Sequence, residues 1–162
     1  MISLHQVTAD LGHELQKQKL MLATAESCTG GGLSYLLTSI PGSSNWFDRG
    51  FICYSNSAKL DMLEVEPLVL EEFGAVSEEA ARQMAEGAIK NSEASVAVAI
   101  TGIAGPGGGT ADKPVGTVWL AWARNGATTR AHVDIYKGNR EEIRLAAIET
   151  AVTTLLAWLK QE

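Results

Sequence analysis

The chain has 162 residues, 46% of them hydrophobic, and a formal net charge of −6 at pH 7. This length and composition fit one folded domain, so we expect residues 1–162 to share one hydrophobic core. The net negative charge argues against a nucleic-acid partner, because proteins bind nucleic acids largely through Lys and Arg side chains that neutralise phosphates. No apolar run reaches the roughly 20 residues that span a membrane.

Helical and strand patterns alternate in the first third of the chain. Apolar residues recur at helical spacing over residues 4–18, which predicts an amphipathic helix. Residues 20–26 predict a short buried strand, and residues 27–32 then turn the chain into a helix over about 30–40. A second strand is predicted over residues 49–55.

Two acidic helices are predicted next, over about 66–73 and 78–91, with Ser77 as the N-cap of the second. Residues 94–101 predict a strand buried on both faces. The most glycine-rich loop of the chain follows, from residue 102 to residue 114.

The last part of the chain predicts a hairpin and a helix. Residues 116–123 and 128–136 form the hairpin across Asn125-Gly126. Asn139 and Glu142 form a capping box for a helix that ends near residue 160. Strands separated by helices, followed by a hairpin, predict an α/β fold in which a mixed sheet carries helices on both faces.

Three loops are expected at the carboxyl ends of the strands, where α/β sheets place their sites. They are residues 27–32, 54–59 and 101–110. Their convergence into one site is an expectation from topology.

The first of these loops offers a hydroxyl and several main-chain N–H groups. Ser27 precedes Thr29, Gly30 and Gly31 and the start of a helix, where free N–H groups can bind a phosphate or an oxyanion. Ser27 is therefore a candidate nucleophile, and a simple helix cap is the alternative. Cys28 is a rival nucleophile, although a buried cysteine in such a place is more often inert.

The second loop offers a possible base for Ser27. A lysine beside a serine acts as a general base when burial lowers its pKa, so Lys59 is a candidate for that role. Tyr54, five residues earlier, could pass the proton between them. A strand tyrosine and a surface lysine are the alternatives.

The remaining candidates concern ligand binding. The loop that begins at Thr101 and Gly102 is either a ligand cradle or a flexible connection, and it lacks the Gly-Lys-Ser/Thr ending of a P-loop. Arg140 and Arg144 lie one turn apart on the last helix, where they could bind an anion or instead form surface salt bridges.

The cysteine and histidine content favours a reducing, cytoplasmic setting. The two cysteines give no disulfide framework, and the cysteines and three histidines lack zinc-ligand spacing, so neither a metal nor a cofactor is expected. Trp46 and Phe47 are interpreted as packing residues, with an interface in a homo-oligomer as the alternative.

Six segments, in order along nearly the whole chain, resemble the CinA C-terminal domain family of nicotinamide-nucleotide amidases. They are Ala25-Glu26-Ser27-Cys28-Thr29-Gly30-Gly31, Pro41-Gly42-Ser43-Ser44, Gly50-Phe51 to Tyr54-Ser55-Asn56-Ser57-Ala58-Lys59, Gly74-Ala75-Val76-Ser77, Thr101-Gly102-Ile103-Ala104-Gly105-Pro106-Gly107-Gly108 and Lys113-Pro114-Val115-Gly116-Thr117-Val118.

The resemblance implies a three-layer α/β/α domain that hydrolyses the carboxamide of nicotinamide mononucleotide, a small anionic nucleotide, to nicotinate mononucleotide and ammonia without a metal. It implies that Ser27 is the nucleophile and that Tyr54 and Lys59 are its activating partners. We add two hypotheses. N–H groups near Thr29–Gly31 or Thr101–Gly102 stabilise the oxyanion, and Arg140 or Arg144 holds the phosphate.

One departure and two alternatives qualify this expectation. The chain has Ser57 where the family often has an acid, which changes the charge beside the predicted base. The alternative functions are a non-catalytic pyridine-nucleotide-binding module of the same fold and an amidase for another small carboxamide.

Overall fold

The computed structural model describes residues 1–161, in which a five-stranded sheet has the order β2-β1-β3-β4-β5. β1 pairs in parallel with both β2 and β3, whereas β4 is antiparallel to both β3 and β5. The sheet is therefore mixed, as predicted. Its strands are β1 (Leu22–Glu26), β2 (Phe47–Ile52), β3 (Val96–Gly102), β4 (Thr117–Arg124) and β5 (Arg130–Ile135).

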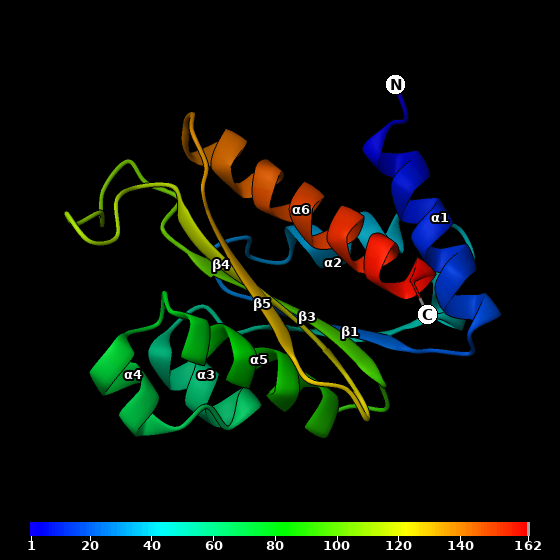
Figure 1. Ribbon diagram of the computed structural model, residues 1–162, viewed down its shortest axis with the longest axis horizontal. Helices are drawn as coiled ribbons and strands as arrows, with labels where there is room; N and C mark the ends of the chain where they lie inside the picture. Colours follow the sequence, from blue (N-terminus) through cyan, green and yellow to red (C-terminus); the bar gives the residue numbers. More distant parts are fainter. Residues whose placement is uncertain (162) are drawn as a thin grey trace.

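Helices cover both faces of this sheet (Figure 1). One layer holds α1 (Leu4–Lys17), α2 (Gly32–Thr38) and α6 (Arg140–Lys160). The other layer holds α3 (Asn56–Leu63), α4 (Pro67–Phe73) and α5 (Glu78–Lys90), and a short 3₁₀ helix spans Ser43–Asn45. This arrangement confirms the expected three-layer α/β/α fold.

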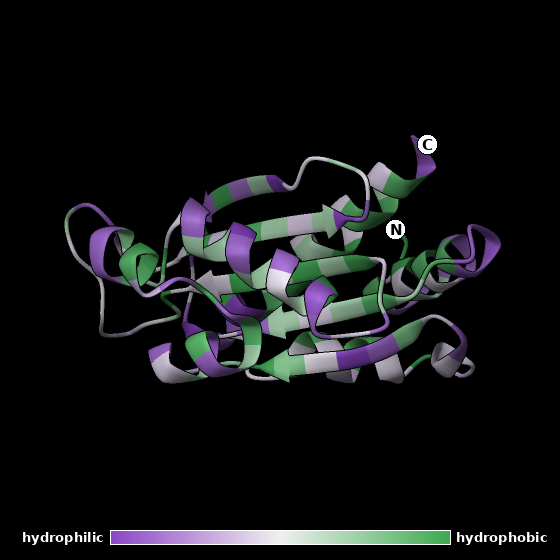
Figure 2. Cartoon of the chain, turned by 90° about the horizontal axis from the view of Figure 1, so that it is seen from below, coloured by the Kyte–Doolittle hydropathy of each residue, from purple (hydrophilic) through white to green (hydrophobic). Residues whose placement is uncertain are grey.

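The two layers bury different kinds of side chain because strand residues alternate between faces. In β3, Val98 and Ile100 pack with the α1 and α6 side, whereas Ala97 and Ala99 pack with Met84 and the alanines of α5. Small residues on that face let α5 lie close to the sheet. Figure 2 shows largely apolar central strands behind α5, whose outward side carries hydrophilic residues.

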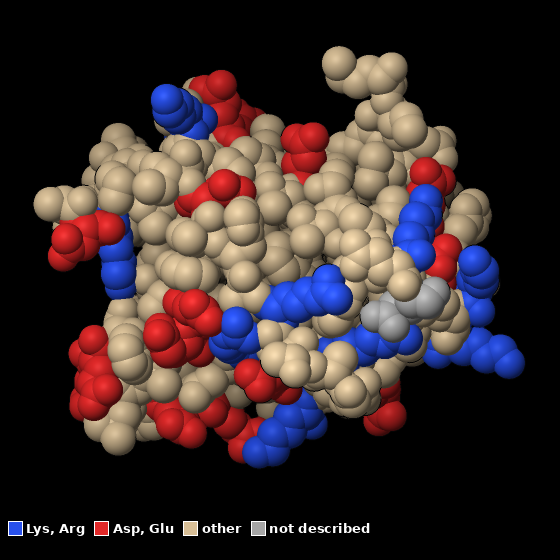
Figure 3. Space-filling view, viewed as in Figure 1, with Lys and Arg blue, Asp and Glu red and all other residues tan. Residues whose placement is uncertain are grey.

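Acidic side chains gather over the layer of α3, α4 and α5, at the lower left of Figure 3. This position matches the two acidic helices expected from the sequence. No helix within residues 1–161 is both long and apolar enough to cross a membrane. In the same residues, no three His, Cys, Asp or Glu side chains come together as a metal-binding group.

The helix ends and the packing residues follow several of the sequence expectations. Asn139 and Glu142 form the predicted capping box of α6. Trp46 is 2% exposed and belongs to the core, which confirms its packing role, and Phe47 packs half-buried against the same cluster. The indole of Trp122 donates a hydrogen bond to the carbonyl of Ala151 and so joins β4 to α6.

Helix α3 was not expected, because residues 54–59 were predicted as a loop. Its eight residues have apolar side chains on no single face, so they give no amphipathic signal. Ser55 begins the helix as an N-cap, and its hydroxyl accepts a hydrogen bond from the N–H of Ala58 at 3.1 Å. Lys59 consequently lies in the first half of a helix rather than on a turn.

Candidate active site

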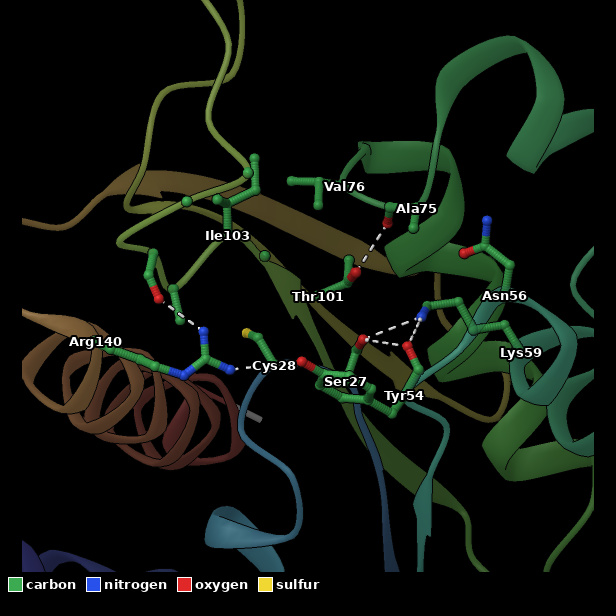
Figure 4. A pocket seen from close by; sticks show the side chains of 15 residues that line it. Ser27, Cys28, Tyr54, Asn56, Lys59, Ala75, Val76, Thr101, Ile103 and Arg140 are labelled. Carbon is green, nitrogen blue, oxygen red and sulfur yellow. Dashed lines mark hydrogen bonds between the residues drawn. The ribbon is translucent and has the colours of Figure 1, made fainter.

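A pocket of about 320 Å³ opens at the carboxyl ends of the parallel strands (Figure 4). Stretches from all three expected loops meet in it, since the carboxyl ends of parallel strands share one edge of a sheet. Helix α6 and the segment between α4 and α5 complete its walls. The lining residues are Ser27, Cys28, Tyr54, Asn56, Lys59, Ala75, Val76, Thr101 to Gly105, Gly107, Gly108 and Arg140.

The structure brings Ser27 and Lys59 together at the floor of the pocket. Lys59 Nζ lies 3.0 Å from Ser27 Oγ. The same nitrogen donates to the carbonyl oxygens of Cys53 at 3.1 Å and Tyr54 at 3.0 Å. Lys59 is only 1% exposed, so it is not the surface lysine of the alternative interpretation.

Burial lowers the pKa of Lys59 below its ordinary 10.5, because the interior disfavours the ammonium form. Electrostatic interactions with Cys53 and Cys28 raise this pKa by less than burial lowers it. In the neutral amine, the two remaining N–H groups still have the carbonyls of Cys53 and Tyr54 as acceptors. The nitrogen lone pair then faces the hydroxyl of Ser27. Chemically, such an arrangement can serve as a nucleophile beside a general base.

Tyr54 contacts the pair through its main chain. Its carbonyl oxygen accepts hydrogen bonds from Lys59 Nζ and, at 3.3 Å, from Ser27 Oγ. Its side chain is 61% exposed, and the phenol oxygen accepts a long hydrogen bond of 3.5 Å from Arg140. The phenol therefore lies beside Arg140 at the pocket mouth and not between Ser27 and Lys59.

Main-chain hydrogen bonds to β3 and within its own turn hold Ser27 in place. Its N–H donates to the carbonyl of Ile100 in β3 at 2.9 Å, and its carbonyl accepts from the N–H of Gly30 at 3.1 Å. The N-cap of α2 is Gly31, so Ser27 is not the helix cap that the sequence left as an alternative.

Thr29, Gly30 and Gly31 do not line the pocket, contrary to the expectation of a ligand-binding helix N-terminus. The N–H groups of Leu33 and Ser34, at the start of α2, donate to the carboxylate of Glu26 at 2.8 and 2.9 Å. These donors are thus already satisfied inside the protein. Glu26 is a residue that sequence reasoning missed.

The side chains of the two predicted arginines of α6 have different contacts. Arg140 lines the pocket, where its Nη1 donates to the carbonyl of Gly105 at 2.7 Å. Arg144 instead donates to the carbonyl of Thr29 at 3.2 Å and does not line the pocket. Of the expected pair, one guanidinium is available beside the cavity.

Cys28 lines the pocket, but its thiol is poorly suited to be the nucleophile. Burial is the largest effect on it and raises its pKa to about 11, so the thiol stays protonated at neutral pH. The amine of Lys59 is directed at Ser27 Oγ. These two facts favour Ser27 over its neighbour.

Thr101 and Gly102 line the pocket as expected, and Thr101 also builds its far wall. The buried hydroxyl of Thr101 donates to the carbonyl of Ala75 at 2.8 Å. This bond holds Ala75 and Val76 at the cavity, where Val76 and Ile103 are directed toward one another (Figure 4). Asn56, Ala75 and Val76 were missed as site residues, although each lies in a segment that carried the family resemblance.

Comparisons with known proteins agree with this architecture. A family model described as the CinA C-terminal domain matches residues 4–159. The nicotinamide-nucleotide amidohydrolase PncC of Enterobacter agglomerans is 44% identical over 158 residues, which cover 97% of this chain and 96% of the relative. The solved structure of the competence/damage inducible protein CihA from Agrobacterium tumefaciens gives a TM-score of 0.94 at 48% identity, covering 98% of this chain and 96% of that chain.

Some relatives are much longer than this chain. A CinA-like protein of Akkermansia muciniphila is 49% identical over 148 residues, which are 91% of this chain but only 36% of the relative. The chain therefore spans about a third of that relative and nearly all of the PncC protein.

Proposed function

The chain belongs to the CinA C-terminal domain family, and from that premise we propose that it hydrolyses the carboxamide of nicotinamide mononucleotide to nicotinate mononucleotide and ammonia. The observation that carries the proposal is the 3.0 Å distance between Lys59 Nζ and Ser27 Oγ in a pocket at the strand ends. The name of the PncC relative supports this substrate.

In the proposed mechanism, neutral Lys59 removes the proton of the Ser27 hydroxyl as Oγ attacks the amide carbon. A tetrahedral intermediate forms, and Lys59 returns the proton to the departing nitrogen, which leaves as ammonia. The product of this half-reaction is an ester between Ser27 and the nicotinoyl group. Lys59 then takes a proton from a water molecule as its oxygen attacks the ester. It returns that proton to Ser27 Oγ as the bond to the serine breaks, and the carboxylic acid product ionises to the carboxylate.

Tyr54 enters this mechanism as a partner through its carbonyl. Together with the carbonyl of Cys53, it holds the two N–H groups of the neutral amine and aims the lone pair at Ser27. Of our two proposed sources of oxyanion donors, Thr101–Gly102 lies at the pocket and Thr29–Gly31 does not. We therefore place the oxyanion on the Thr101–Gly102 side.

Arg140 is the proposed anchor for the substrate phosphate. Its guanidinium lies at the pocket mouth beside the Tyr54 phenol, away from Lys59. A guanidinium binds phosphate through charge-assisted hydrogen bonds. A substrate with its carboxamide at Ser27 and its phosphate at Arg140 would extend from the floor of the pocket to its mouth.

The test is ammonia release from nicotinamide mononucleotide by the purified protein and by Ser27→Ala. Loss of a nucleophile should lower kcat by several powers of ten. Ser39→Ala is the matched control, because the hydroxyl of this exposed serine donates to the carbonyl of Leu36 in its own helix region, away from the pocket. An active Ser27→Ala variant would refute the assigned nucleophile.

Two other outcomes would select the alternative functions. Binding of the mononucleotide in calorimetry without ammonia release over hours would indicate a non-catalytic binding module. Turnover of other carboxamides but not of the mononucleotide would indicate an amidase with a different substrate.

A further inference from the structure

Glu26 is a fully buried acid that immediately precedes Ser27 and does not line the pocket. Its Oε1 accepts hydrogen bonds from the Thr29 hydroxyl at 2.6 Å and the Leu33 N–H at 2.8 Å. Its Oε2 accepts from the Ser34 N–H at 2.9 Å and the Ser34 hydroxyl at 2.7 Å. Four donors from the turn and from α2 thus converge on one carboxylate.

These bonds enclose the turn that carries the proposed nucleophile. Glu26 and Thr29 flank Ser27 and Cys28, so the bond between their side chains closes a short loop around them. The main-chain carbonyl of Glu26 accepts from the N–H of Cys53 at 2.9 Å, in the segment that leads to Tyr54. Glu26 therefore links the turn, α2 and the segment whose carbonyls hold the Lys59 amine.

Capping α2 does not by itself explain a buried acid in this place. An exposed Ser, Thr, Asp or Asn at the N-cap would satisfy the same N–H groups. Burying a carboxylate is unfavourable unless every hydrogen-bonding position is filled, and here the protein fills them with donors from the turn and from α2. The position of the acid is therefore better explained by what it holds in place.

We propose that Glu26 is a positioning residue for the reaction at Ser27, acting through its bond to Thr29, which fixes the turn so that Ser27 Oγ stays within reach of Lys59 Nζ. The inference rests on the proposed function. Charge-assisted hydrogen bonds suit this task because they are short and strong. A displacement of about 1 Å at a reacting atom can cost on the order of 10²-fold in rate.

The carboxylate offers a matched pair of variants, because two hydroxyls donate to it from different sides. Thr29→Val removes the hydroxyl that lies in the turn, and Ser34→Ala removes the hydroxyl that lies in α2. We expect Thr29→Val to lower kcat on the order of 10²-fold with little change in KM, because Arg140 and the loop after β3 keep their places. Thr29→Ser, which keeps the hydroxyl, should recover most of that loss, and Ser34→Ala should keep kcat near wild type.

The contrast between these variants separates positioning from plain stability. If Thr29→Val and Ser34→Ala lower the melting temperature alike while neither changes kcat, or if both lower kcat alike, the proposal is overturned. Glu26→Gln should lower kcat at least as far as Thr29→Val, because its amide turns N–H groups toward two of the four donors. Because this buried change can prevent folding, the decision rests on the Thr29 and Ser34 pair.

A second measurement separates this inference from the proposed function. The rate at which phenylmethylsulfonyl fluoride modifies Ser27, followed by intact mass, reports the reactivity of the hydroxyl without any amide substrate. If the wild type releases no ammonia from nicotinamide mononucleotide, the proposed function fails, but slower modification in Thr29→Val than in Ser34→Ala still supports positioning. Equal modification rates of Thr29→Val and Ser34→Ala overturn the positioning proposal. If the wild type neither releases ammonia nor is modified, both proposals are overturned.

Discussion

Lys59 Nζ lies 3.0 Å from Ser27 Oγ, although the two residues are 32 positions apart in the chain and belong to different layers of the fold. Ser27 follows the central strand β1, and Lys59 reaches it from the first half of α3. The carbonyls of Cys53 and Tyr54 hold the amine on its other sides. This pairing sets how activity should depend on pH.

We expect kcat/KM to rise with pH through the pKa of Lys59 and then to level off, because only the neutral amine accepts the Ser27 proton. Burial places that pKa below 10.5, so the rise should come at a lower pH than for an exposed lysine. The pH–rate profile of the wild type measures it. A profile that falls as pH rises through neutrality would contradict Lys59 as the base.

Linkage gives a second consequence for the same residue. Since the pKa of Lys59 is lower in the folded than in the unfolded chain, the unfolded chain binds more protons between the two values. The contribution of Lys59 to stability therefore improves as pH rises across that window. Lys59→Met should remove this slope from the free energy of unfolding, and Lys17→Met, at a side chain that is 76% exposed, should not.

Arg140→Ala should weaken binding of the nucleotide more than binding of the corresponding nucleoside. Hydrogen bonds to a charged group contribute about 1.5–3 kcal/mol, so the loss in kcat/KM for nicotinamide mononucleotide should be roughly 10- to 100-fold. Arg144→Ala is the matched comparison, because that guanidinium binds the carbonyl of Thr29 outside the pocket. Equal kcat/KM of the wild type for nucleotide and nucleoside would show that no arginine contacts the phosphate.

The layers and the location of the site could be predicted because they depend on local patterns. Short buried runs indicated strands, helical spacing and N-cap residues indicated the long helices, and the strand ends then located the three loops. The difference between Arg140 and Arg144 was not predictable, since both occupy one helix face and only the course of the glycine-rich loop decides which meets the pocket.

The burial of Lys59 and the role of Glu26 were also not predictable from the sequence. Lys59 is buried because α3 packs against α5, and α3 itself has no amphipathic pattern. Glu26 ends a strand that was predicted only as buried, and its four donors come from the turn and the start of the helix that follow it. Both features arise from tertiary contacts that periodicity does not report.

Gly87→Ala should destabilise the fold by about 1–3 kcal/mol, because a methyl group there meets main chain that cannot move aside. A Cβ at Gly87 of α5 would overlap the carbonyl oxygen of Leu63, at the end of α3. Urea unfolding measures the loss, and Glu86→Ala, at an exposed neighbour on the same helix, should stay within about 0.5 kcal/mol of wild type. Equal stability of the two variants would show that α3 and α5 separate without cost.

Ser57→Asp should move the rise in kcat/KM to higher pH. Ser57 is the second residue of α3, two positions before Lys59, and its hydroxyl lies 3.1 Å from that of Ser55. A negative charge there favours the ammonium form of Lys59 and so raises its pKa. The same charge at a helix start should stabilise the protein by about 0.3–1 kcal/mol at low ionic strength.

Ser57→Asn separates charge from shape in this comparison, because the amide has the size of the acid and can bond Ser55 without carrying a charge. The shift in the pH–rate profile should be present in Ser57→Asp, absent in Ser57→Asn, and smaller in high salt, since position 57 is exposed and salt screens its charge. If both variants shift the profile equally, the effect is one of local structure. If neither does, an acid at this position does not tune the base, and the serine found here leaves the reaction unchanged.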